Sequence, residues 1–247
     1  MSFVNDQNKY LMKPFQFKQF KIKHKQTAHK VGTDAVLLGA WTNLDDQPVD
    51  ILDIGTGSGV IALMLAQRST AESIDAIEIN PQAYEECVEN FEASPYNDRL
   101  FCYHGDVKTF AQEIDLKYDL IVSNPPFFIE DVTHHSMARE QARQQVSLSY
   151  AELLTAVKAL LTENGQLAVI LPFDHQEYFI KIARQKALFL NRLTKVRGQK
   201  NSAVKRSLMQ FSFDKKPLIE DELILEISRH QYTQDYKDLV QDFYLSL

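Results

Sequence analysis

A short apolar run that leads into three closely spaced glycines constrains the fold of this chain more than any other stretch. Residues 49–54 alternate apolar residues with two aspartates, as in a buried strand, and Gly55, Gly57 and Gly59 follow at once. The apolar stretch 60–67 then predicts a helix. A strand, a glycine-rich turn and a helix N-terminus together form a nucleotide pocket, because glycine lets the backbone approach a ligand closely.

The order of residues in this turn distinguishes two kinds of nucleotide cofactor. The dinucleotide fingerprint Gly-x-Gly-x-x-Gly needs a glycine where this chain has Val60. Asp53, at the end of the strand, can accept a charge-assisted hydrogen bond from an ammonium group, which a pyrophosphate cofactor lacks. The pattern therefore favours a nucleoside that carries an amino acid over NAD.

Acids also follow the next two predicted strands. The strand at 73–80 carries Glu78, which is placed to hold both hydroxyls of a ribose, although an acid there could serve solubility alone. Pro81 opens a helix that runs to about residue 91. The third strand, 100–104, leads to Asp106, which is placed to accept a hydrogen bond from an adenine amino group.

The segment before the glycine turn offers one more cofactor-binding candidate. Residues 31–41 indicate a turn and then a helix, with Thr33 or Asp34 as a good N-cap. The same turn could instead form a lip over the ligand, beside a neighbouring strand end, and Thr33 would then contact the cofactor.

A stiff corner follows the fourth predicted strand, 118–123. Its residues are Asn124, Pro125, Pro126 and Phe127, and the two prolines prevent both a strand and a helix from continuing. The Asn124 side-chain oxygen and the Pro125 carbonyl can each accept one hydrogen of an amino group, while its planar ring lies on Phe127. The alternative is a proline-rich turn with no ligand.

Basic residues gather in three parts of a chain whose net charge is −6. The arm 1–30 interleaves lysines with aromatic residues, the polar loop 129–147 is a candidate lid or substrate clamp, and residues 181–216 hold eleven Lys and Arg against one acid. These features suit contacts to nucleic-acid phosphates, although solvated surfaces or an exposed edge hairpin would look similar. The candidate RNA contacts are Lys21, Lys23, Lys25, Arg139, Arg143, Arg197, Lys200, Lys205 and Arg206.

The remaining elements predict one large α/β unit with small additions. A helix at 149–161 ends at Asn164-Gly165, and a fifth strand at 166–171, a helix at 174–186, a sixth strand at 188–196 and an antiparallel seventh strand at 204–213 follow. We expect an arm or hairpin at 1–30, a main domain at 31–216, and a strand and helix extension at 217–247, with acidic composition, packed on the same domain.

Composition argues against several other classes of protein. Cys87 and Cys102 form neither a disulfide framework nor a metal cluster, which suits two free thiols in a reducing cytosol. His134 and His135 have no cysteine partner nearby, and we expect no metal there. The N-terminus lacks a secretory pattern and no apolar run is long enough to span a membrane. We therefore expect a cytoplasmic protein with no membrane association and no obligatory protein partner.

Taken together, these motifs resemble those of the S-adenosylmethionine-dependent methyltransferases. The Asn-Pro-Pro-Phe corner is similar to that of enzymes that methylate planar amino groups. Almost the whole chain resembles the bacterial tRNA(Val) adenosine-37 N6-methyltransferase family, through the stretches Phe15-Gln-Phe-Lys-Gln-Phe20, Lys30-Val-Gly-Thr-Asp-Ala-Val-Leu-Leu-Gly-Ala-Trp41, Ile51-Leu-Asp-Ile-Gly-Thr-Gly-Ser-Gly59, Ser123-Asn-Pro-Pro-Phe-Phe128 and Asp242-Phe-Tyr-Leu245.

The resemblance implies a Rossmann-like class I α/β fold, with a seven-stranded, mostly parallel sheet, helices on both faces and an antiparallel last strand. It also implies S-adenosyl-L-methionine as cofactor, tRNA as partner, and Asn124, Pro125 and Phe127 as the catalytic residues. Many family members have Tyr where this chain has Phe127, and guanine-N2 enzymes often carry Phe. A guanine-N2 rRNA methyltransferase, a protein-glutamine methyltransferase and a non-catalytic RNA-binding module therefore remain as alternatives.

Overall fold

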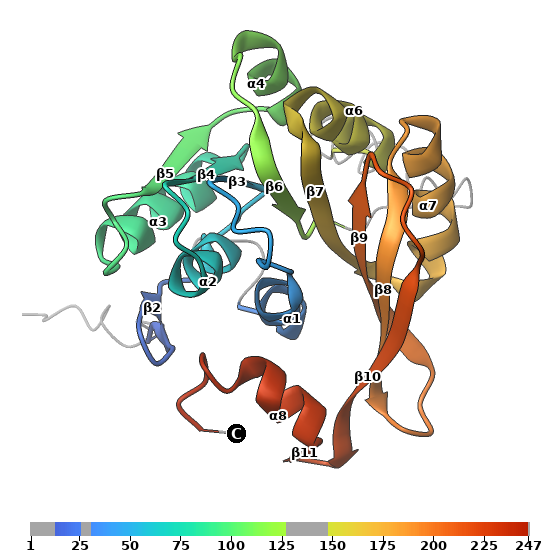
Figure 1. The fold of residues 1–247 in the computed structure, drawn as a ribbon. Coiled ribbons are helices and arrows are strands. Elements are labelled where there is room, and N and C mark those ends of the chain that lie inside the picture. The colour runs from blue at the N-terminus through green and yellow to red at the C-terminus, as the bar shows by residue number, and fades with distance from the viewer. Residues whose placement is uncertain (1–12, 26–30, 127–147, 247) are drawn as a thin grey trace, which may run out of the picture.

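A nine-stranded, mostly parallel sheet forms the centre of the computed structural model, which describes residues 13–25, 31–126 and 148–246. The strand order is β11-β10-β8-β9-β7-β6-β3-β4-β5 (Figure 1). The strands span Asp50–Ile54 (β3), Ser73–Glu78 (β4), Leu100–His104 (β5), Tyr118–Ser123 (β6), Leu161–Pro172 (β7), Phe189–Gln199 (β8), Val204–Ser212 (β9), Ile219–Ser228 (β10) and Gln231–Tyr232 (β11).

The sheet confirms the predicted class of fold but contains more strands than expected. β9 runs antiparallel to both β7 and β8, as predicted for the seventh strand. β10 then pairs in parallel with β8, and β11 pairs antiparallel with β10. The seven predicted strands are therefore β3 to β9, and the acidic segment after residue 217 adds two strands at one edge.

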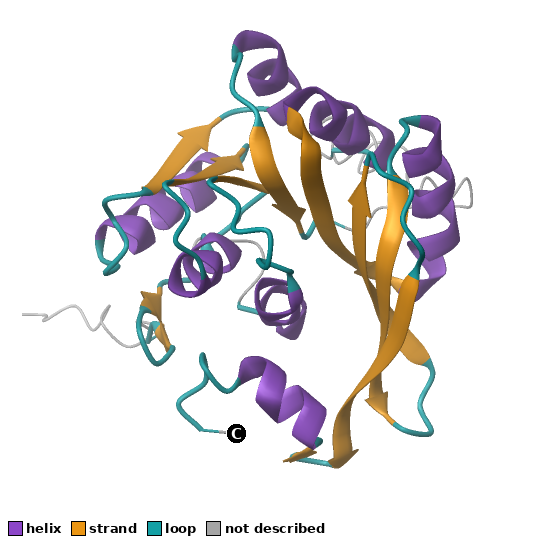
Figure 2. Cartoon of the chain, viewed as in Figure 1, coloured by secondary structure: helices purple, strands orange, loops and turns teal. Residues whose placement is uncertain are grey.

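Helices cover both faces of the sheet (Figure 2), and each face has its own buried apolar cluster. One cluster contains residues of α1, α2, α3 and α8, and the other contains residues of α4, α6 and α7. The helices span Thr33–Trp41 (α1), Val60–Arg68 (α2), Pro81–Glu92 (α3), Val107–Glu113 (α4), Tyr150–Leu160 (α6), Gln176–Gln185 (α7) and Gln234–Val240 (α8), and a short 3₁₀ turn, Phe173–His175 (η1), precedes α7.

Two predicted boundaries are wrong. The helix α6 ends at Leu160, within one residue of the predicted end, but the fifth strand begins at Leu161 rather than at 166, so Asn164-Gly165 lies within β7 and not in a turn between the two. The pairing between β6 and β7 shifts from Tyr118↔Leu161 to Leu120↔Gln166. The extra residues of β7, which include Asn164-Gly165, form an irregularity between these two pairs. Neither Thr33 nor Asp34 caps α1, whose N-cap is Gly32 without a side-chain hydrogen bond.

The N-terminal arm forms a small hairpin that packs on the body. Its two strands, β1 (Phe15–Gln16) and β2 (Lys21–Ile22), pair antiparallel. Phe17 and Ile22 are fully buried, and Phe17 forms a bridge to Tyr244 near the other end of the chain. Within the described part of the arm, Phe17, Phe20 and Ile22 therefore belong to the core, and the exposed residues include Lys21, Lys23 and Lys25.

None of the helices within the described ranges combines the length and the apolarity that a membrane crossing needs. The same residues contain no group of three or more histidine, cysteine or acidic side chains that could hold a metal ion.

Candidate active site

The parallel register brings the predicted site residues to one edge of the sheet. Ile54, the last residue of β3, pairs with Ile77 on one side and with Ser123 on the other. The glycine turn therefore begins between Glu78 and Asn124, which are the next residues of the neighbouring strands. The Ser123 hydroxyl donates a hydrogen bond of 2.9 Å to the Ile54 carbonyl and fixes the corner to the turn.

The three glycines of the turn all need a left-handed backbone, but they face different surroundings. Their φ angles are 71° at Gly55, 58° at Gly57 and 81° at Gly59. A Cβ on Gly59 would lie 2.5 Å from the ring of Phe91, whereas no described residue lies within 4 Å of a Cβ on Gly55 or Gly57. Gly59 is therefore required by packing, and the other two face open space that a ligand can fill.

Asp53 is buried completely beneath this turn. One carboxylate oxygen accepts a hydrogen bond of 2.6 Å from the Thr56 hydroxyl, and the other has no partner among the described residues. Burial raises the pKa of Asp53 to about 7, against the opposing effect of the Thr56 hydroxyl and the Ala62 backbone. The glycine spacing alone did not identify Thr56 as a site residue. A hydroxyl side chain within the turn could have indicated the hydrogen bond to Asp53.

Glu78 is held in place by two backbone N–H groups. One of its carboxylate oxygens accepts from Gly57 at 2.9 Å and the other from Asn80 at 2.8 Å. Each oxygen keeps a further lone pair for a second donor. The Glu78 carboxylate is therefore fixed before any ligand binds. It lies beside the glycine turn, where the sequence predicts that it holds a ribose.

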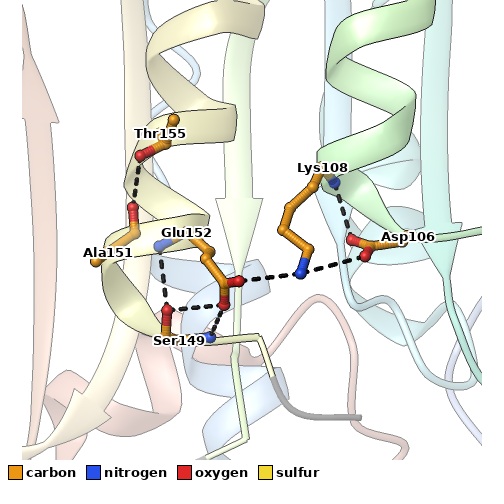
Figure 3. A network of polar contacts seen from close by, with 6 residues as sticks. All are labelled: Asp106, Lys108, Ser149, Ala151, Glu152 and Thr155. Carbon is orange, nitrogen blue, oxygen red and sulfur yellow. Dashed lines mark hydrogen bonds and ion pairs between the residues drawn. The ribbon is translucent and has the colours of Figure 1, made fainter. Parts of the chain in front are cut away.

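Asp106 caps the start of α4 and joins a wider polar network. Its carboxylate accepts a 2.9 Å hydrogen bond from the Lys108 backbone and lies 3.4 Å from the Lys108 ammonium. Lys108 also pairs with Glu152 at 3.0 Å, and Glu152 completes a capping box with Ser149 (Figure 3). The backbone of Ser149, followed by Lys108, lowers the pKa of Glu152 to about 2. The network ties the first turns of α4 and α6 together.

The corner after β6 contains an open acceptor. The Asn124 side-chain oxygen is buried and has no hydrogen-bond donor among the residues that the structure describes. Pro125 is buried and Pro126 is exposed. An unpaired buried acceptor costs free energy, so this oxygen favours a ligand that brings a donor. Phe127, the third predicted catalytic residue, lies outside the described residues.

Thr33 is exposed, and several of the candidate RNA contacts already form ion pairs with acidic side chains. Thr33 is exposed at the first residue of α1, and the neighbouring Asp34 pairs with Arg206 at 2.7 Å. Lys23 pairs with Glu89 at 2.9 Å, and Arg197 with Glu222 at 2.5 Å. Arg139, Arg143, His134 and His135 lie outside the described residues.

Two acids of the C-terminal segment pair with basic residues of the neighbouring strand. Because β10 lies beside β8, Glu220 pairs with Lys195 at 2.6 Å and Glu222 pairs with Arg197. Part of the positive charge between residues 181 and 216 is therefore neutralised within the sheet. The charge counts along the sequence could not show this, because they carry no information on which strands are neighbours.

These features fit S-adenosylmethionine in three respects. Gly55 and Gly57 leave space against the backbone, Asp53 presents a buried oxygen to which no described residue donates, and Glu78 presents a fixed carboxylate. A ligand with an ammonium group and a ribose has donors for both acids. Asn124, directly after the adjacent strand β6, offers a separate acceptor to a second molecule.

Comparisons with known proteins agree with this chemistry. The model of the methyltransferase small domain family matches residues 31–185. The tRNA1(Val) (adenine(37)-N6)-methyltransferase of Christiangramia forsetii is 53% identical to this chain, over 95% of this chain and 98% of that protein. The protein of the same name from Bacteroides fragilis is 42% identical, over 94% of this chain and 98% of that protein.

A solved structure supports the fold as well. The chain described as a predicted O-methyltransferase from Agrobacterium tumefaciens has a TM-score of 0.67 and 19% identity, and the match covers 85% of this chain and 96% of that one. At that identity the likeness shows the fold alone.

Proposed function

Because the chain belongs to the tRNA1(Val) (adenine(37)-N6)-methyltransferase family, we propose that it methylates N6 of adenosine 37 in a valine tRNA. S-adenosyl-L-methionine is the methyl donor. The observation that supports the proposal best is the buried Asn124 oxygen, which has no donor in the described ranges and lies one residue beyond the strand beside the glycine turn. An exocyclic amine supplies the donor that this oxygen lacks.

The residues at the ends of β3, β4 and β5 bind the donor in this proposal. Asp53 holds the ammonium of its amino-acid end, Glu78 its ribose hydroxyls and Asp106 its adenine amine. Gly55, Gly57 and Gly59 shape the backbone against it, and Thr33 lies at the rim. When bound, S-adenosylmethionine supplies an electrophilic methyl group on a sulfonium centre.

The corner residues prepare the amine for attack. The lone pair of adenine N6 is delocalised into the ring, so the nitrogen is a poor nucleophile. The Asn124 oxygen and the Pro125 carbonyl accept its two hydrogens, which draws the nitrogen toward tetrahedral geometry and stabilises the positive charge that develops on it. Phe127 stacks on the base and fixes its plane. Orientation and charge stabilisation thus supply the catalysis, without a covalent nucleophile.

Basic side chains hold the tRNA so that the base can reach this corner. The contacts that we assign are Lys21, Lys23, Lys25, Arg139, Arg143, Arg197, Lys200, Lys205 and Arg206. A base in the anticodon loop is already partly unstacked, so its extrusion costs less free energy than extrusion from a duplex. A tRNA substrate also implies that the protein acts in the cytoplasm.

The test is methyl transfer from labelled S-adenosylmethionine to total tRNA by the purified protein, followed by mapping of the labelled nucleoside. We expect N6-methyladenosine at position 37 of a valine tRNA. Label in N2-methylguanosine would identify a guanine-N2 enzyme, and label in protein a glutamine methyltransferase. Cofactor binding without any transfer to RNA or protein would contradict the proposal.

A further inference from the structure

One buried side chain connects the glycine turn to the basic arm. Asn90, in α3, is 2% exposed and uses all of its hydrogen-bonding groups. Its oxygen accepts from the Lys23 backbone N–H at 2.8 Å, and its nitrogen donates to the Lys23 carbonyl at 2.9 Å. The same nitrogen donates to the carbonyl of Ser58 at 2.8 Å. Ser58 lies between Gly57 and Gly59, inside the predicted cofactor turn.

Other residues of α3 also contact the glycine turn and the arm. Cys87 and Phe91, one turn apart on α3, fill the space beside Gly59. The Glu86 carboxylate accepts a 2.6 Å hydrogen bond from the Lys25 backbone N–H. Asn90 lies between these two sets of contacts, and its side chain hydrogen-bonds to the backbone of both the turn and the arm.

We propose that Asn90 is a positioning residue that couples cofactor binding to tRNA binding. The inference rests on the proposed function, since it takes the lysines of the arm as tRNA contacts. A bound cofactor restrains the turn at Ser58, and Asn90 transmits that restraint to the backbone of Lys23. The arm then loses less conformational freedom when it binds RNA, so each ligand raises the affinity for the other.

Linkage makes this coupling measurable from either ligand. If the cofactor raises the affinity for tRNA by some factor, tRNA must raise the affinity for the cofactor by the same factor. The reaction product S-adenosylhomocysteine is the suitable probe, because no methyl transfer occurs during the titration. A merely structural role of Asn90 would lower stability and leave this factor unchanged.

The experiment is calorimetric titration of S-adenosylhomocysteine into the full-length protein, with and without saturating tRNA. In the wild type we expect tRNA to lower the Kd by about tenfold, within the usual range for coupled sites. In Asn90→Ala the factor should fall below about twofold, while binding without tRNA persists. The matched control is Glu89→Ala, which removes the exposed ion pair with Lys23 and leaves the bonds to Ser58 and the Lys23 backbone, so the coupling should stay at the wild-type value.

Three results would overturn the inference: no coupling in the wild type, full coupling in Asn90→Ala, or loss of coupling in Glu89→Ala. Hydrogen exchange of the wild type provides a second measurement if Asn90→Ala fails to fold. Saturating S-adenosylhomocysteine should slow exchange in peptides that cover residues 21–25, and unchanged exchange there would also reject the inference. Absence of tRNA binding by the wild type would instead defeat the proposed function, whereas tRNA binding without coupling would defeat the role of Asn90 alone.

Discussion

The two halves of the site differ in how complete their hydrogen bonding is. On the β3 and β4 side, both oxygens of Glu78 and one oxygen of Asp53 already have partners from the protein. On the β6 side, the Asn124 oxygen is buried with no donor in the described part of the chain. The cofactor half, at Asp53 and Glu78, is therefore largely preorganised by the protein. The target half, at Asn124, needs its substrate to supply a hydrogen-bond donor.

The largest effect should come from the target half. Replacing Asn124 by alanine removes one of two acceptors for the developing charge, which costs about 3 kcal/mol of barrier, or about 10²-fold in the rate of transfer. Affinity for S-adenosylhomocysteine should stay near the wild-type value, because Asn124 lies outside the cofactor half. Single-turnover transfer and calorimetric binding measure the two quantities. If the transfer rate and the affinity for S-adenosylhomocysteine fell together, Asn124 would belong to the cofactor half as well.

Two glycine substitutions separate packing from cofactor contact within the preformed half. Gly59→Ala combines a left-handed backbone with overlap against Phe91, so it should reduce the free energy of unfolding by about 3 kcal/mol. The added methyl group of Gly57→Ala meets no atom of the described residues, so this change should cost only about 1 kcal/mol. The methyl group intrudes on the ligand space, however, and should weaken S-adenosylhomocysteine binding by about tenfold or more. Thermal unfolding measures the stability of each variant, and titration measures its affinity for S-adenosylhomocysteine. A larger loss of stability in Gly57→Ala than in Gly59→Ala would contradict this assignment.

Asp53 makes the cofactor half sensitive to pH. Burial raises its pKa to about 7, and an ammonium ligand requires the ionised form. Affinity for S-adenosylhomocysteine should therefore fall by about tenfold per unit as the pH drops below 7. The free energy of unfolding changes in the opposite direction: the contribution of Asp53 is present below about pH 4 and is lost as the pH rises to about 7.

Titrations between pH 5.5 and 7 check this sign, with Asp53→Asn as the variant that cannot ionise. Its affinity should be weaker and nearly independent of pH, at roughly the level of the wild type with Asp53 protonated. A variant that keeps the wild-type pH profile would show that another group is responsible.

The smallest effect should come from the exposed network at α4 and α6. Lys108→Met removes the ion pair with Glu152 and the contact to Asp106. Solvent screens such pairs, so the free energy of unfolding should fall by less than about 1 kcal/mol. Cofactor affinity should change by less than about threefold, because the Lys108 backbone still fixes Asp106. A large loss of affinity would place Lys108 inside the cofactor half.

The elements that the sequence predicted well are those with strong local patterns. The strands β3 to β6 and the helices α2 and α3 lie within two residues of their predicted bounds, since buried runs, glycines and Pro81 mark them. The start of β7 was predicted too late, because Leu161 already pairs with Tyr118 and Asn164-Gly165 lie in the irregularity before the next pair, Leu120↔Gln166. β10 was harder to place, because nothing local shows that an acidic strand will lie beside β8 and pair with its basic residues.

The site shows the same division. Asp53, Glu78 and Asn124 could be brought together from sequence, because parallel strands end at one edge. The relay through Asn90 could not, since it joins residues 67 and 32 positions away through contacts that only the packed fold creates. Phe127 and the arginines of the 129–147 loop stay predictions, and so does the division of the chain at residues 30 and 216.

The most direct measurement is the crystal structure of the protein bound to S-adenosylhomocysteine and an anticodon stem-loop that carries unmodified adenosine 37. We expect N6 to lie about 2.9 Å from both the Asn124 side-chain oxygen and the Pro125 carbonyl, with its lone pair directed toward the sulfur. An Asn124 oxygen that is satisfied by the protein itself, with N6 beyond hydrogen-bonding distance, would contradict this expectation.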